Sequence, residues 1–246
     1  ETIDEMKAME GELKPDEWSL FSDAYTRKCR FAQAQVGMER SYQEGRSMLS
    51  GFPIVNYGIK GTRKLFEAAN EPYYLNASDE DPRLQLEIAF ASGFSRYLSH
   101  TLHDLTQHSK DYPLDKRLQN CQYEDRLASY YTERGVPITV NFAGNLTGWN
   151  MPSYKDTLSV LQALLSAEQG LRHFEIQVSN GMNIVQDVAA NRALVRMIPE
   201  YLNKFGYRGL TFFNRGYPFQ GSWPPDLFQM ASVAAICVTI AVLQGV

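Results

Sequence analysis

The stretch from Ser99 to His108 holds the densest group of chemically useful side chains in this 246-residue sequence. Three of the four histidines and one carboxylate fall within nine residues, namely His100, His103, Asp104 and His108. Imidazole and carboxylate groups transfer protons near neutral pH, and a protonated imidazole also holds an anion. We interpret the stretch as an active-site loop. Asp104, His103 and His108 are the predicted catalytic residues. His100 is predicted to bind substrate.

Two other interpretations of this stretch stay open. His100 and Asp104 would share one face of a helix, which is compatible with a metal site. The histidine spacing matches no standard zinc signature, so no metal ligand is predicted. A surface loop without a catalytic role is the other alternative.

Polar residues also recur where predicted β-strands end, and in an α/β barrel these carboxyl ends form the active site. Turn chemistry accounts for each asparagine taken singly. The recurrence at nearly every strand end indicates instead a pocket lined with amide donors and acceptors. Arg27, which follows the first predicted strand, can hold a carboxylate or a sulfate with its forked guanidinium group. The predicted substrate-binding residues are therefore Arg27, His100, Asn56, Asn76, Asn141, Asn180, Asn214 and Arg215.

Short β-rich runs alternate with longer helical runs along the chain. This alternation predicts parallel βαβ units, and without a Rossmann glycine fingerprint it favours a barrel over an open sheet. The predicted strands span residues 18–21, 53–56, 73–75, 137–141, 173–178 and 210–213, and the helices 61–70, 83–94, 121–134, 154–169, 184–205 and 226–244. We predict one α/β domain, residues 1–246, built as an incomplete TIM (β/α)8-type barrel. A tail or a partner chain is expected to supply the closing strands.

Composition and charge are those of an ordinary soluble globular protein. Hydrophobic residues make up 44% of the chain and charged residues 21%, and the net charge of -4 gives no basic surface for nucleic acid. Polar residues interrupt the apolar run Met230–Val246, which is predicted to be a buried barrel helix. The cysteines at positions 29, 121 and 237 are predicted to be buried free thiols in helices. Together with the lack of a signal peptide, they favour a cytoplasmic location.

Several short motifs are spread over nearly the whole chain. They are Ser22-Asp23-Ala24-Tyr25-Thr26-Arg27, Gly45-Arg46-Ser47-Met48-Leu49-Ser50-Gly51-Phe52-Pro53, Val55-Asn56-Tyr57-Gly58, Tyr123 with Asp125-Arg126-Leu127, Leu146-Thr147-Gly148, Ala167-Glu168-Gln169-Gly170 and Gln186-Asp187. Together they resemble the large (E) subunit of glutamate mutase, also called methylaspartate mutase. The resemblance implies a cobalamin-dependent TIM barrel that rearranges the carbon skeleton of glutamate by radical chemistry, beside a small B12-binding partner subunit.

The family's substrate-binding and catalytic residues match this sequence only in part. The resemblance implies three arginines that hold the substrate carboxylates. One of them would precede the first residue, one matches Arg27 and the third falls on Asn76. The family's catalytic glutamate falls on Leu98, and its two substrate-contacting tyrosines fall on Asp104 and His108. The scaffold is therefore kept, while the residues that carry the chemistry differ.

From these differences we predict a diverged mutase-like enzyme that acts on an amino-acid-derived substrate by non-radical chemistry. Its class stays open between lyase, cyclase and isomerase. In the reaction that suits these residues, Asp104 takes a proton from an amine, and histidine or Arg27 stabilises a departing anion. An intramolecular displacement or elimination of this kind closes a small nitrogen ring, such as an aziridine, in antibiotic biosynthesis.

Two alternatives to this function are kept. One is a cobalamin-dependent carbon-skeleton mutase similar to glutamate mutase, and the other is a non-catalytic structural subunit. No cofactor is expected under the leading prediction, and adenosylcobalamin is expected only under the first alternative. The expected partners are a companion polypeptide that completes the barrel in a hetero-oligomer and a small amino-acid-like substrate, free or carried on another protein. No nucleic acid or membrane partner is expected.

Overall fold

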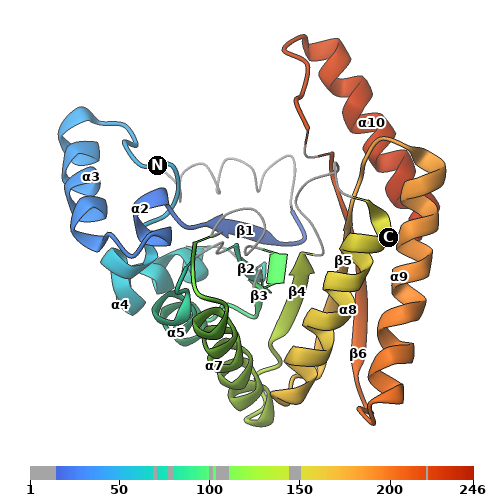
Figure 1. The fold of residues 1–246 in the computed structure, drawn as a ribbon. Helices are drawn as coiled ribbons and strands as arrows, with labels where there is room; N and C mark the ends of the chain where they lie inside the picture. Colours follow the sequence, from blue (N-terminus) through green and yellow to red (C-terminus); the bar gives the residue numbers. More distant parts are fainter. Residues whose placement is uncertain are drawn as a thin grey trace.

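Six parallel strands, hydrogen-bonded in the order in which the chain forms them, make one sheet (Figure 1). The computed structural model describes residues 15–68, 71–76, 80–99, 102–103, 111–143, 151–219 and 221–246. The strands are β1 (Trp18–Phe21), β2 (Tyr73–Asn76), β3 (Arg96–Ser99), β4 (Thr139–Ala143), β5 (His173–Ser179) and β6 (Thr211–Tyr217). A doubly wound sheet reverses its strand order at a switch point, so this unbroken order excludes that open topology.

Helices connect the strands and cover one side of the sheet, which we call the outer face (Figure 1). The helices are α2 (Ala24–Arg27), α3 (Phe31–Glu44), α4 (Ile54–Ala68), α5 (Arg83–Ser92), α7 (Leu114–Glu133), α8 (Pro152–Glu168), α9 (Ile184–Lys204) and α10 (Leu227–Gln244). The predicted α/β class is therefore confirmed. The strands predicted near residues 18, 73, 137, 173 and 210 are all present, with ends that shift by a few residues.

Successive strand residues alternate between the outer face and the opposite, inner face. Val140 and Phe142 of β4 and Phe174 of β5 pack in the main hydrophobic core with residues of the helices. On the inner face, Tyr74 and Leu98 form a separate small apolar cluster. The main core therefore lies between the sheet and its helices, and the inner face can carry polar side chains.

Side chains join the two ends of the sheet. Glu17 precedes β1 and Arg215 lies on β6, yet Oε1 of Glu17 and Nη1 of Arg215 are 2.9 Å apart. The six strands therefore curl until the inner faces of the first and last strands meet. In the described part of the chain, β1 pairs only with β2, and β6 pairs only with β5. Apart from the carbonyl oxygen of Phe21, which accepts a hydrogen bond from the backbone N–H of Phe52, the outer edges of β1 and β6 have no strand partner among the described residues.

The predicted end of one long helix is confirmed in detail. Gly170 follows α8 in the left-handed region, with φ of 92°. A Cβ atom at this position would lie 2.7 Å from Oγ of Ser129 on α7. Only glycine meets both the backbone and the packing requirement, so α8 ends where the sequence predicts.

The strand predicted at residues 53–56 is wrong, because this segment begins α4. The backbone N–H of Asn56 donates to the carbonyl oxygen of Pro53, as in a first helical turn. A single β-bridge, between Ser22 and Phe52, occurs next to the expected strand. Proline suits the start of a helix because it lacks the N–H group that would be unbonded there. This effect outweighs the β-branched residues that follow it.

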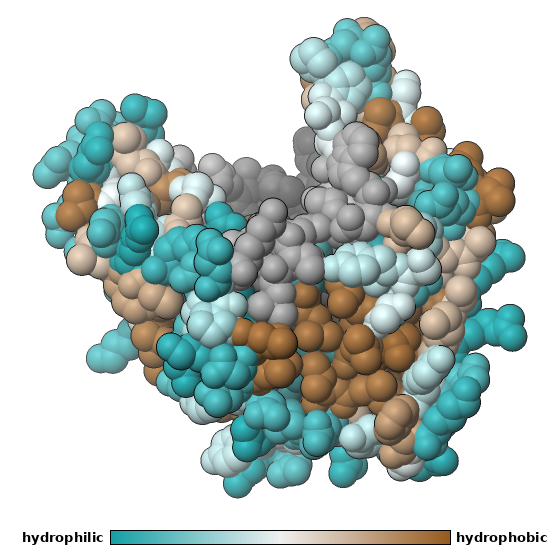
Figure 2. Space-filling model, in the orientation of Figure 1, coloured by the Kyte–Doolittle hydropathy of each residue, from teal (hydrophilic) through white to brown (hydrophobic). Residues whose placement is uncertain are grey.

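The carboxyl-terminal helix α10 is far more exposed than the buried helix that the sequence predicts. Only 17% of its residues are buried, and Cys237 and Ile240 are among them. Phe228 is 86% exposed and Val242 is 68% exposed. Helix α10 packs on α9 and β6 along one side only. Figure 2 shows apolar surface on this side of the molecule and also between α7 and α8. Such exposed apolar area typically marks a contact with another molecule.

Length and composition alone would let α10 cross a membrane, and no other helix in the described ranges meets the same criterion. Core helices of soluble proteins have the same two properties, so one such helix is weak evidence for a membrane span. It does not change the assignment of α10 as a connecting helix of the α/β fold.

Two of the three cysteine predictions are confirmed. Cys121 and Cys237 are buried free thiols in α7 and α10. Cys29 is exposed and lies in the turn after α2, with φ of 52°. The prediction for Cys29 is wrong because α2 ends after a single turn, which places this thiol outside the helix.

Candidate functional site

Four charged side chains form a closed ring on the inner face of the sheet. Nη1 of Arg96 lies 2.8 Å from Oε2 of Glu175 and 2.7 Å from Oε2 of Glu17. Nη1 of Arg215 lies 3.1 Å from Oε1 of Glu175 and 2.9 Å from Oε1 of Glu17. Glu175 is only 1% exposed. Because each carboxylate contacts both guanidinium groups, the four charges balance and the buried Glu175 is compensated.

The register of the sheet explains why these residues meet. Asn141 of β4 lies beside Glu175 of β5, and Gln177 of β5 lies beside Arg215 of β6. Neighbouring strands are about 5 Å apart, so inward side chains on adjacent strands come within hydrogen-bonding reach. Three consecutive strands, β4 to β6, thus build the centre of the site, and Arg96 on β3 completes it.

Asn141 connects the charged ring to the neutral part of the inner face. Its Nδ2 atom donates to Oε1 of Glu175 at 2.7 Å and to Oε1 of Gln177 at 3.0 Å. Its Oδ1 atom is buried and has no hydrogen-bond partner among the described residues. A buried acceptor without a partner is costly, so this atom suits an N–H donor of a bound molecule.

Tyr74 supplies a second buried polar atom of this kind. The guanidinium carbon of Arg215 lies 5.0 Å from the centre of the Tyr74 ring, in a cation–π arrangement. The hydroxyl group is buried and has no partner among the described residues. Burial raises the pKa of Tyr74 well above its ordinary value. The hydroxyl therefore stays protonated and can donate to a ligand.

A cavity of about 290 Å³ opens beside the ring, lined by Glu17, Arg96, Glu175, Phe213, Asn214 and Arg215. This volume lies at the small end of ligand pockets and suits a molecule of amino-acid size. Burial alone would lower the pKa of Arg215, but the nearby Glu175 and Glu17 outweigh burial and raise it. Arg215 therefore stays charged, and the two guanidinium groups can hold an anionic group in place of a carboxylate of the ring.

Three predicted substrate-binding residues lie on the inner face. Asn141 and Arg215 both contact Glu175. Asn76, at the end of β2, is buried and is in register with Phe21 of β1. The structure therefore places these three residues on the same face of the sheet as the ring of charges.

Three other predicted asparagines point away from the inner face. Asn214 exchanges two hydrogen bonds with Asn191 of α9, at 3.1 and 3.3 Å. Asn180 accepts a hydrogen bond from Gln244 of α10 at 3.3 Å. Asn56 donates to a backbone oxygen of α3 at 3.0 Å. The side chain of Asn214 takes the outer face because it lies one position from Arg215, although the residue lines the cavity beside the ring, and Asn56 lies in a helix.

Arg27 ends α2, close to the carboxyl ends of the first strands. Oδ1 of Asp23 accepts hydrogen bonds from the backbone of α2 at 2.9 and 3.2 Å and fixes the start of this helix. The next residue, Lys28, pairs with Glu80 beyond β2 at 2.7 Å. Arg27 itself is half-buried and has no ion-pair partner among the described residues. Its predicted role in binding an anionic group stays a prediction.

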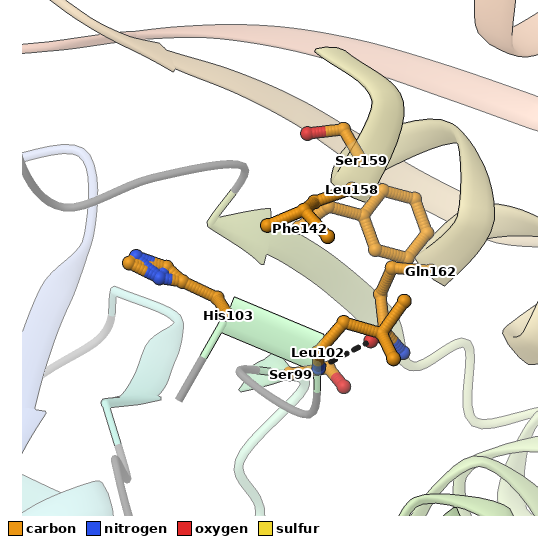
Figure 3. A pocket seen from close by; sticks show the side chains of 7 residues that line it. All are labelled: Ser99, Leu102, His103, Phe142, Leu158, Ser159 and Gln162. Atoms are coloured by element: carbon orange, nitrogen blue, oxygen red, sulfur yellow. Dashed lines mark hydrogen bonds between the residues drawn. The ribbon is translucent and has the colours of Figure 1, made fainter. Parts of the chain in front are cut away.

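The histidine-rich stretch lies largely outside the described residues, and this holds for Asp104, His100 and His108. His103, which lies among them, is 4% exposed and follows β3. Figure 3 shows its imidazole extending away from the side chain of Gln162. The adjoining cavity of about 10 Å³ has room for a single water molecule at most. No group of three or more metal-ligating side chains occurs within the described ranges.

A group of buried polar side chains supports the end of β3 from behind the sheet. The Tyr97 hydroxyl donates to Oδ1 of Asp125 at 2.5 Å, and the Cys121 thiol lies 3.4 Å from Oδ2. Gln162 donates to Cys121 and accepts from the backbone N–H of Leu102, next to His103. Burial raises the pKa of Asp125 from 3.8 to about 6, although the hydrogen bond from Tyr97 lowers it. The cluster therefore ties α7 and α8 to the chain that leaves β3.

Glu17, Arg96 and Glu175 are site residues that the sequence analysis missed. Arg96 and Glu175 stand inside short runs of strand-forming residues. A charged residue is rarely buried unless it is paired. Glu175, a charge inside the predicted strand 173–178, was therefore a usable signal for an ion pair, whereas no strand was predicted around Arg96.

Residues 1–246, the whole chain, match the family described as methylaspartate mutase E chain (MutE). The chain is also similar to proteins named glutamate mutase epsilon subunit. It is 35% identical over 227 residues to that of Desulfitobacterium hafniense (strain Y51), which covers 92% of this chain and 47% of the relative.

Two further relatives come from distant organisms. The chain is 34% identical over 226 residues to the glutamate mutase epsilon subunit of Treponema denticola, covering 91% of this chain and 46% of the relative. It is 32% identical over 222 residues to that of Halobacterium salinarum, covering 90% and 46%. The chain therefore spans about half the length of the curated relatives it matches.

Proposed function

The chain belongs to the methylaspartate mutase E chain family, and from this premise we propose that it is one part of a mutase-like enzyme for a small amino-acid-derived substrate. The substrate site is the inner face of the sheet around Glu175. The observation that carries this proposal is the ring of four charges beside the unpartnered Asn141 Oδ1 and Tyr74 hydroxyl. Opposite charges fixed side by side suit a substrate that carries both an ammonium and an anionic group.

The proposed chemistry is an intramolecular displacement. Asp104 removes a proton from the substrate ammonium, and the free amine attacks a neighbouring carbon that bears a sulfate ester. The C–N bond forms as the C–O bond breaks, and the electron pair leaves with the sulfate, so an aziridine results. His103, His108 and Arg27 would stabilise the departing anion. The unpaired state of Arg27 among the described residues supports its part in this proposal.

The resemblance also implies adenosylcobalamin, so the described residues must be compared with that cofactor. The cavity on the inner face measures about 290 Å³, which suits an amino acid. At the position implied for the family's catalytic glutamate, Leu98 is 3% exposed and packs against Tyr74. Within the described ranges, these residues do not fit a cobalamin-dependent radical site. No step of the proposed mechanism uses the cofactor.

A companion polypeptide is the second part of the proposal. The unpaired edges of β1 and β6 and the exposed apolar side of α10 support it. Strands added between β6 and β1 would close the curled sheet into a (β/α) barrel and cover the backbone groups at both edges. The active form is then a hetero-oligomer, and its site lies at the junction of the two chains.

The test uses the purified complex and an α-amino acid that carries an amine and a sulfate ester on neighbouring carbons. Ion chromatography measures free sulfate, and mass spectrometry measures the cyclised product. We expect equal amounts of both without added cobalamin. If the complex instead converts glutamate to 3-methylaspartate and requires adenosylcobalamin, the proposed displacement is wrong. The enzyme is then a carbon-skeleton mutase, the alternative that family membership favours. Turnover of neither substrate would leave a non-catalytic subunit.

A further inference from the structure

A large groove lies beside β1 on the outer face, away from the candidate site. Its volume is about 930 Å³. The floor is apolar, and the rim carries hydroxyl and basic groups. The lining residues that matter most come from the end of β1, from α3, from the loop after α3 and from α4, namely Leu20, Tyr42, Arg46, Phe52, Tyr57 and Lys64.

The two flanks of α4 show where this groove stands in the outer layer. One flank faces α5, because Arg63 donates to a backbone oxygen of α5 at 2.6 Å. The other flank carries Gly61 and Lys64, which line the groove, and Tyr57 lines it from the turn before the break in α4 at Gly58, where φ is 61°. Helices of the outer layer pack side by side, as the contacts of α4 with α5 show. The groove is therefore the position of one more helix, next to α4 and beside β1.

The charges of the groove are of one sign. Arg46 and Lys64 line it, no carboxylate does, and neither cation has an ion-pair partner among the described residues. Phe52 and Tyr57 stack with ring centres 4.8 Å apart. Burial, and then the hydrogen bond with Tyr42, raises the pKa of Tyr57 to about 12, so this wall stays neutral. An occupant with an apolar face flanked by carboxylates complements both features.

We propose that this groove docks an amphipathic helix of the companion polypeptide, whose carboxylates pair with Arg46 and Lys64. The inference rests on the proposed function, because it assigns the companion a docking surface. The edge of β1 adjoins the groove through Leu20 and Phe21, and among the described residues it has no strand partner before Phe21, whose carbonyl oxygen accepts from the backbone N–H of Phe52. In a parallel sheet, the helix that connects a new strand to its neighbour packs on the outer face by a right-handed crossover. One strand at the edge of β1 and one helix in the groove thus come from the same βα unit.

The first experiment reverses the charge of the groove in the complete complex. The companion is purified with the tagged chain, identified by mass and titrated against variants by isothermal calorimetry. Arg46→Glu with Lys64→Glu should weaken the complex about tenfold or more and reduce its dependence on salt. Lys60→Glu is the matched control, since Lys60 is an exposed residue of α4 that does not line the groove. It should leave the dissociation constant within about twofold.

A second measurement maps the occupant of the groove directly. A photo-cross-linking amino acid replaces Tyr42, which is 74% exposed at the rim. The cross-link should map to a helix of the companion that bears aspartate or glutamate beside apolar residues. An unchanged dissociation constant in the double variant, or a cross-link to a second copy of this chain, would overturn the docking site and leave the proposed function intact. Failure to find any companion would overturn the companion part of the proposed function as well.

Discussion

Glu175 is the residue on which the inner face depends most. It contacts Arg96, Arg215 and Asn141 at once and is almost completely buried. Removing one partner of a buried ion pair typically costs about 3–5 kcal/mol. Both arginines would keep Glu17 and are partly exposed, so we expect Glu175→Gln to lower the free energy of unfolding by about 2 kcal/mol.

Urea unfolding followed by circular dichroism measures this change. The matched control is Glu200→Gln, because Glu200 pairs with Lys204 on the exposed side of α9 at 2.7 Å. The control should unfold at the wild-type urea concentration. Equal midpoints for both variants would show that the ring does not stabilise the fold, and the site would then lose its structural basis.

Asp104 carries the chemical part of the proposal. Loss of a general base lowers turnover by about 10²–10⁴-fold, and Asp104→Asn should do so while the variant still binds substrate. Arg27→Ala should mainly raise KM, because Arg27 is proposed to hold the anionic group. Initial rates of sulfate release by the complex separate the two effects. Near-wild-type turnover of Asp104→Asn would remove this aspartate from the mechanism.

At the scale of the secondary-structure elements, the cluster between β3, α7 and α8 makes stability depend on pH. The pKa of Asp125 is about 6 in the fold and 3.8 ordinarily, so the native state binds its proton more tightly than the unfolded state. The stabilising contribution is therefore complete below about pH 4 and is lost as pH rises through 6. The whole shift corresponds to about 3 kcal/mol.

Asp125→Asn should remove this part of the pH dependence, because the amide does not titrate. Unfolding free energies between pH 4 and 7 test the expectation. Asp156 on α8 also has a pKa raised to about 6 by burial, so the variant must be compared with the wild type at each pH. Parallel curves for the two proteins would show that Asp125 does not titrate in this range.

The elements also show how far the sequence alone could lead. Most strands and helices after residue 70 follow from hydrophobic period and glycine caps such as Gly170, which act locally, but β3 (Arg96–Ser99) was not predicted. The segment 53–56 was misassigned, since the helix-starting effect of Pro53 competes with β-branched residues of equal local strength. The exposure of α10 could not be predicted, because an apolar helix has the same sequence whether or not another chain covers it.

The site was predicted in part for a related reason. The rule that polar residues at strand ends line a pocket locates a residue at the end of a strand. It does not say which face of the sheet the side chain takes. The side chains of Asn141 and Arg215 lie on the inner face, where the rule expects them. The side chain of Asn214 lies on the outer face because Asn214 is one position from Arg215. A shift of one residue reverses the face of a strand, so only the register of the sheet resolves the difference.

At the scale of the whole molecule, the exposed side of α10 should make the isolated chain associate with itself. Phe228 and Val242 are 86% and 68% exposed, while Cys237 and Ile240 hold the helix to the body. Replacing Phe228 and Val242 by serine should reduce self-association and leave the fold unchanged. Light scattering of the chain without its companion measures the effect. A monodisperse wild-type chain would contradict the proposed role of α10.

The central claim is that substrate binds on the inner face of the sheet. Two buried asparagines test it most directly, one on this face and one outside the site. Calorimetric titration of the complex with the sulfated amino acid gives the dissociation constant for each variant. Asn141→Ala removes a side chain of the site, and Asn120→Ala removes a buried asparagine of α7 that donates to the backbone oxygen of Glu80 and does not line the cavity. The account predicts binding at least about tenfold weaker for Asn141→Ala and unchanged for Asn120→Ala. Equal dissociation constants for Asn141→Ala and the wild type, in a variant that remains folded, would contradict it.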